Sequence, residues 1–210
     1  MKTPVFEPIG PPLPFGPDAM SPPANDAVMA WQPAQVSRFD ALLHEINPDA
    51  PRVDIPRLQA LAEWLVEQPP AEAQGIMQTR LDRIEWVRAM LADRDWDTAA
   101  GTRARAARML EYLDSDDDLI PDQTPLLGRL DDVLLFDLAW EAFEAETEEY
   151  RDFCDYRRDE HPSGSGRAQQ AAWLRDRLAE LAQLQHNARV RDGHYVDTRL
   201  PPDERFHVVA

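Results

Sequence analysis

The sequence has little of several features that mark particular classes of protein. Its 210 residues include one cysteine, Cys154, which excludes an intramolecular disulfide and favours a reducing compartment. It has no run of about 20 apolar residues, the length that a membrane-spanning helix requires. The first 33 residues have no apolar segment typical of a secretory signal. Together these absences predict a cytoplasmic protein.

Basic residues are fewer than acidic ones. The chain has 22 Lys and Arg and 39 Asp and Glu, which gives a formal net charge of -17 at pH 7. Charge of this sign repels phosphate backbones and anionic lipids, so we expect neither a nucleic-acid partner nor a membrane partner. The acidity is concentrated, because residues 111–160 contain 18 Asp and Glu against 4 Arg. An acidic face attracts basic surfaces, and we therefore expect a protein partner with a basic surface. The oligomeric state does not follow from this pattern.

Proline dominates residues 1–33, which hold 9 of the 19 prolines. Because proline lacks an amide donor and has a fixed φ, a helix or a central strand is excluded there. Prolines 8, 11, 14 and 17 recur every three residues, the period of a polyproline II helix. We expect an extended tail that packs on its own domain or in a partner's groove, or else a disordered leader. A second ridge of the same tail would comprise Phe6, Ile9, Pro12 and Phe15.

Residues 34–190 show the helical period in their apolar positions and predict an all-α bundle of about five to seven helices. Asp54 is expected to cap a helix that has Pro56 in its first turn, and Pro69-Pro70 is expected to end it. We expect the helix that begins near residue 126 or 128 to run to Glu160 and to project its charged second half into solvent. The expected helices cover about residues 36–46, 54–68, 71–94, 97–113, 126–160 and 167–185.

We make two predictions for the C-terminal part of the chain. The last helix, to about residue 185, should turn Leu174, Leu178 and Leu181 inward and pair antiparallel with the helix before it. Residues 191–210 then form a short tail, in which residues 194–197 and 205–209 are β-prone. This tail either forms a small β-hairpin or is an ordered or loose tail without strands.

Acids and prolines alternate over residues 118–132. Pro121 cannot continue a helix, and Gly128 permits a close approach of the backbone. Asp131 and Asp132 then fall early in a helix, where the helix dipole favours anions. We therefore expect a sharp helix–turn–helix corner at this point.

The acids of this corner are candidate ligands for Mg²⁺ or Ca²⁺, ions that prefer carboxylate oxygens. The candidate metal ligands are Asp118, Asp122, Asp131 and Asp132. A calcium loop starting at Asp114 is incomplete, because Leu119 stands at the turn glycine and Pro125 at the bidentate Glu. The alternative is that these acids only cap helices and carry solvated charge. No other cofactor is expected.

The same segment resembles the YkvA-like domain family, a bacterial family of unknown function. The resemblance covers about residues 105–140 and is carried by Asp118-Leu-Ile-Pro-Asp122, Pro125, Gly128, Asp131 and Asp132, preceded by Tyr112-Leu113. The chain departs from the family at Asp116-Asp117, where a proline and an apolar residue are common, and in its polar flanks. The resemblance implies an all-helical module and, from the family's hydrophobic helices, a peripheral membrane role. It implies no activity.

No nucleophile or oxyanion-stabilising motif accompanies the carboxylates. We therefore expect a non-enzymatic helical protein that acts in protein–protein interaction or regulation through its acidic face. One alternative is a divalent-cation-binding module or a metal-dependent enzyme at the acidic corner. Another alternative is a peripheral membrane-associated module.

Overall fold

The computed structural model describes residues 13–15, 29–115, 118–121 and 123–196, and side chains as far as residue 191. Within these ranges it contains seven α-helices, one short 3₁₀ helix and no strand, which confirms the all-α prediction. The elements are α1 (Pro33–Ile46), α2 (Ile55–Glu67), α3 (Pro70–Ala92), α4 (Ala100–Leu113), α5 (Leu130–Ala139), η1 (Trp140–Ala142), α6 (Glu144–Glu160) and α7 (Arg167–Val196). None of the described helices is long and apolar enough to cross a membrane.

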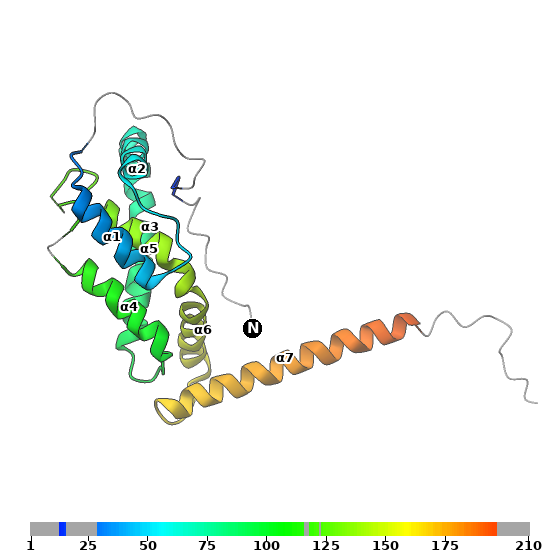
Figure 1. Cartoon of the computed structure of the whole chain (residues 1–210). Helices are drawn as coiled ribbons and strands as arrows, with labels where there is room; N and C mark the ends of the chain where they lie inside the picture. The colour runs from blue at the N-terminus through cyan, green and yellow to red at the C-terminus, as the bar shows by residue number, and fades with distance from the viewer. Residues whose placement is uncertain (1–12, 16–28, 116–117, 122, 197–210) are drawn as a thin grey trace, which may run out of the picture.

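Helix α5 lies at the centre of the bundle, and α7 projects from one end of it (Figure 1). Eight of the ten residues of α5 are buried, so this helix is covered on nearly all sides. It contacts α1, α3 and α4, and α3 also contacts α2 and α6. The acidic corner predicted from the sequence leads directly into α5, which places that corner against the core.

Local signals set the ends of the first helices as predicted. Asp54 caps α2, since its carboxylate accepts a hydrogen bond from the Arg57 amide at 2.9 Å. Helix α1 ends at Ile46, and the buried Asn47 that follows donates from its side chain to the Leu138 carbonyl at 2.9 Å. Pro69 separates α2 from α3.

The prediction of one helix from about residue 126 to Glu160 is wrong. Leu126 has a φ of 65°, in the left-handed region that a helix cannot use, and α5 starts only at Leu130. The helical path breaks again at Phe143, whose φ of -126° leaves the helical range. Phe143 is 1 % exposed, so its packing in the core holds the chain at this break between η1 and α6.

The charged helix α6 packs on the bundle, contrary to the prediction that it projects into solvent. It contacts α3 and α7. Its inward face consists of Thr147, Tyr150, Phe153 and Tyr156, each no more than 6 % exposed. These positions recur every three residues among acids and arginines, so the helix combines a narrow aromatic face with a wide charged one.

Helix α7 differs from the prediction in its length and in the direction of its leucines. It continues to Val196 rather than ending near residue 185, because alanine, leucine, glutamine and arginine all favour a helix. Residues 194–196 therefore lie in α7 and not in a strand, while residues 205–209 lie outside the described residues. Leu174, Leu178 and Leu181 are 47–56 % exposed, so the expectation that they turn inward is wrong.

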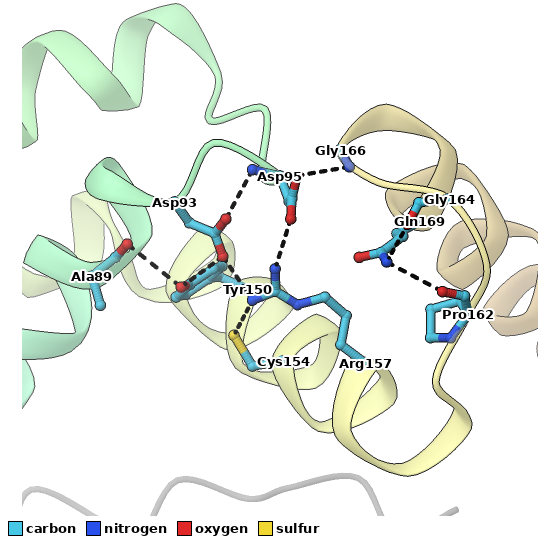
Figure 2. A network of polar contacts seen from close by, with 10 residues as sticks. All are labelled: Ala89, Asp93, Asp95, Tyr150, Cys154, Arg157, Pro162, Gly164, Gly166 and Gln169. Carbon is cyan, nitrogen blue, oxygen red and sulfur yellow. Dashed lines mark hydrogen bonds and ion pairs between the residues drawn. The ribbon is translucent and has the colours of Figure 1, made fainter.

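Polar contacts fix the start of α7 on the bundle (Figure 2). The Arg157 guanidinium of α6 donates to Asp93 at 2.7 Å and lies 3.5 Å from Asp95, both in the segment after α3. Asp95 also accepts a hydrogen bond from the Gly166 amide at 2.7 Å, one residue before α7 begins. Tyr150 donates its hydroxyl hydrogen to the same Asp93 carboxylate at 3.1 Å. The direction in which α7 leaves the bundle is therefore set by these contacts.

Part of the proline-rich segment packs on the core. Leu13 and Phe15 are 6 % and 3 % exposed. The Leu13 amide lies 3.4 Å from Asp137, whose other oxygen accepts a hydrogen bond from Arg80 Nε at 2.8 Å. Phe15 belongs to the second ridge predicted for the tail, and the other members of that ridge lie outside the described residues.

The ion pair between the buried Arg80 and the partly buried Asp137 allows a test of this packing. Arg80 is 1 % exposed, so removing its partner leaves a guanidinium in the core. We expect Asp137→Ala to lower the free energy of unfolding by about 3–5 kcal/mol. The double variant Arg80→Met/Asp137→Leu should lose less, because it removes both charges at once. Urea denaturation measures both, and equal losses in the two variants would contradict this account.

Candidate functional site at the acidic corner

Three acidic side chains converge where the segment after α4 meets the start of α5. Asp118 lies in that segment, and Asp131 and Asp132 lie in the first turn of α5. One carboxylate oxygen from each lies within 4.8 Å of the others. Asp122, the fourth candidate ligand, lies outside the described residues. The structure therefore brings together three of the four residues that the sequence singled out.

The carboxylate of Asp131 organises this corner. Its Oδ2 accepts hydrogen bonds from the Tyr112 hydroxyl at 2.8 Å, the Leu119 amide at 2.9 Å and the Ile120 amide at 3.1 Å. Leu119 and Ile120 are themselves buried, so their amides have no access to water. One oxygen atom thus joins the end of α4, the following segment and the first turn of α5.

The other oxygen of Asp131 has no such partners. Asp131 is 1 % exposed, and among the described residues its Oδ1 is buried without a hydrogen-bond donor. A buried acceptor left unpaired costs about 1–3 kcal/mol, and more when it is charged. An unpaired group of this kind in a folded protein calls for a ligand, an ion or a water molecule.

Burial raises the pKa values of the two adjacent acids, and repulsion adds to the rise only at Asp132. Burial raises the pKa of Asp131, although the hydrogen bonds from Tyr112 and the two amides oppose it. Burial and then the charge of Asp131 raise the pKa of Asp132 to about 7. The Arg129 guanidinium, 3.1 Å from Asp132, acts in the opposite direction but is itself half-exposed. The two acids are thus poorly compensated by protein cations.

A cleft of about 240 Å³ opens beside the cluster, between α1, α4 and the corner. Asp118, Leu119 and Tyr112 form part of its wall, and Arg38 and Arg108 line it as well. Asp118 is partly exposed, whereas Asp131 and Asp132 are buried. The cluster therefore communicates with solvent on the side of Asp118.

Several acids of residues 111–160 have basic partners within the chain. Asp114 accepts two hydrogen bonds from Arg88, each of 3.0 Å, and Glu111 accepts one from Arg108 at 2.7 Å. Asp137 is bound to Arg80. These pairs reduce the charge that an acidic face presents to a partner, and the basic protein partner stays a prediction.

Sequence reasoning missed two residues of the site. Tyr112 was noted only as part of the family pattern, and its hydrogen bond to Asp131 depends on how α4 lies beside α5. Arg129 pairs with Asp132 three residues later, a spacing that could have indicated the contact.

Comparisons with protein-family models, curated proteins and solved structures found no match to this chain. The resemblance to the YkvA-like family therefore stays a prediction. What the corner can do follows from its geometry.

The raised pKa of Asp132 gives a test of the corner without any ion. In the unfolded chain an aspartate has a pKa of about 3.9. In the folded protein the pKa of Asp132 is about 7. The folded state therefore holds the proton more tightly. The stability from this proton is complete below about pH 4 and is lost as the pH rises through 7.

We expect Asp132→Asn to raise the free energy of unfolding by about 2 kcal/mol at pH 8 and by less at pH 5. Urea denaturation with a chelator present measures the difference. The matched control is Asp114→Asn, because a hydrogen bond from Arg88 lowers the pKa of that exposed acid. The control should lose stability at pH 8, and an unchanged effect of Asp132→Asn at both pH values would refute the assignment.

Proposed function

We propose that this protein is a non-enzymatic, divalent-cation-binding helical module, in which Asp118, Asp131 and Asp132 hold the ion at the corner between α4 and α5. The observation that carries this proposal is the Oδ1 atom of Asp131, which is buried in a cluster of three carboxylates and receives no hydrogen bond from any residue that the structure describes. Mg²⁺ and Ca²⁺ are the ions whose preferred ligands match this set of oxygens.

The charge of the cluster supports a cation. Two unit charges 4 Å apart interact by about 4 kcal/mol at the effective dielectric constant of a protein surface. Three carboxylates within 4.8 Å therefore repel one another strongly unless a proton or a cation lies among them. At neutral pH a proton is only partly available, since the pKa of Asp132 is about 7. A divalent ion would displace that proton, so binding should tighten as the pH rises.

The burial of the acids supports an ion that organises structure rather than one that performs chemistry. Asp131 and Asp132 are 1 % and 4 % exposed. A catalytic ion needs a coordination position that a substrate can reach. Of the three acids, only Asp118 lines the cleft.

Such an ion would have a defined effect on the molecule. It would tie Asp118 to the first turn of α5, where Asp131 already holds the amides of Leu119 and Ile120. Asp118 and Leu119 form part of the cleft wall, so the ion would regulate the shape of that cleft. The proposed role is therefore regulatory, with the cleft as the part that responds.

Thermal unfolding and calorimetry of the chelator-treated protein test the proposal. We expect MgCl₂ or CaCl₂ at about 100 times its dissociation constant to raise Tm by about 5–10 °C. Asp118→Asn should weaken binding by about tenfold, because it removes one charged ligand of three. Circular dichroism of the variant should be unchanged, since Asp118 is not in a helix.

The control variant Asp114→Asn removes a nearby exposed acid and should keep the affinity of the unmodified protein. The proposal fails if neither ion gives binding heat or a shift in Tm. It also fails if Asp118→Asn and the control bind the ion equally well.

A further inference from the structure

Helix α7 stands largely clear of the bundle (Figure 1). Its attachment is confined to its first half. Trp173 is 5 % exposed, Asp176 accepts a hydrogen bond from the Tyr156 hydroxyl at 2.8 Å, and Arg177 lies 3.5 Å from Glu149. From Leu178 to Arg191 every side chain is exposed.

The exposed part of α7 has an apolar stripe. Leu174, Leu178 and Leu181 follow the spacing i, i+4, i+7, which places them on one face of the helix. Their exposed fractions are 48 %, 56 % and 47 %, and Leu184 beside them is 57 % exposed. This alternation of three and four residues is the spacing of a helix–helix seam. An exposed stripe of large apolar side chains marks an interaction surface.

The energetics of helix formation also favour a partner for the exposed part of α7. In proteins most of the stability of a helix comes from the packing of its amphipathic face rather than from the helix propensity of its residues. The segment after Leu178 has neither a buried side chain nor a neighbouring helix among the described residues. A partner that covers the leucines would supply the packing that the bundle does not.

The residues that flank the stripe identify the chemistry of that partner. Two of the arginines lie beside the leucines; further along the same two edges come Ala182 and Leu184 and then, beyond the last leucine, two more arginines. These arginines are Arg175, Arg177, Arg189 and Arg191. In a pair of helices the flanking side chains of one helix meet those of the other. The flanking positions of a second copy of α7 hold no carboxylate, since Asp176, Glu180 and Asp192 fall at other positions of the helix. An antiparallel copy would place arginine against arginine.

We propose that α7 binds an acidic amphipathic helix of another protein, with the leucine stripe as the seam and Arg175, Arg189 and Arg191 paired with Asp or Glu of the partner. The negative charge of the bundle does not prevent this. Exposed charges are screened over about 8 Å at physiological ionic strength, and α7 leads away from the bundle. The proposal does not depend on the cation site.

Two designed helical peptides test the proposal with the full-length protein. Both carry the same leucine seam; one has glutamate and the other lysine at the flanking positions. We expect the glutamate peptide to bind about tenfold more tightly in fluorescence anisotropy at low salt, and the preference to shrink at high salt. Leu178→Ser/Leu181→Ser should abolish binding. Gln183→Ser, on the far side of α7, should keep it.

A charge-reversal variant keeps the test valid if the serine variant loses helix. Arg189→Glu/Arg191→Glu leaves the leucines in place and should favour the lysine peptide instead. Equal affinity for the two peptides would overturn the proposal. So would a dimer in light scattering that Leu178→Ser/Leu181→Ser converts to a monomer, because a second copy would then be the occupant. Binding to vesicles of anionic lipid in place of either peptide would assign the stripe to a membrane.

Discussion

Oδ2 of Asp131 accepts three hydrogen bonds, and the arrangement of the bundle depends on them. They place the segment after α4 against the first turn of α5, the central helix of the core. Tyr112, one of the donors, also packs edge-on against Phe39 of α1, with ring centroids 5.6 Å apart. A single carboxylate therefore connects α1, α4 and α5. An aliphatic side chain in place of Asp131 would leave the buried Ile120 amide without its acceptor and the Leu119 amide with the Tyr112 hydroxyl alone, at 3.0 Å.

Helix α5 carries two buried acids, Asp131 and Asp132, and a partly buried one, Asp137, in two settings that differ in charge balance. Asp137 faces the fully buried guanidinium of Arg80 and the Leu13 amide, so its charge has a partner in the core. Asp131 and Asp132 face another carboxylate, that of Asp118, and the guanidinium nearest to Asp132 is half-exposed. The first arrangement is a structural ion pair. In the second, burial raises the pKa values of Asp131 and Asp132, and the proposed cation would balance the charge of these acids.

The sequence predicted features that local chemistry decides. Asp54 caps α2 because a short acid before a helix accepts its free amides, and the acids at positions 118, 131 and 132 converge because the corner between them turns sharply. The failures concern contacts with distant parts of the chain. In α6 the guanidinium of Arg157 lies 4.6 Å from the centre of the Phe153 ring and covers it. The sequence shows the charge of Arg157 but not that it lies over a buried aromatic side chain. The leucines of α7 are spaced so that they share one face of the helix, as predicted. That spacing does not show whether a neighbouring helix covers this face.

The acidic corner and α7 lie at opposite ends of α4, a helix of 14 residues that is about 21 Å long. Charges on the exposed part of α7 lie more than a screening length from the corner, so the field of an ion there has little effect on them. Any coupling would have to pass through the packed helices, along α4 or along α5, η1 and α6. The segment before α4 is held by Arg157 and Gly166 through Asp93 and Asp95, which opposes movement of α4. The same contacts set the direction of α7 before a partner arrives, and a preset direction lowers the entropy lost on binding. The two surfaces are therefore expected to work independently, with the bundle as a rigid support for both.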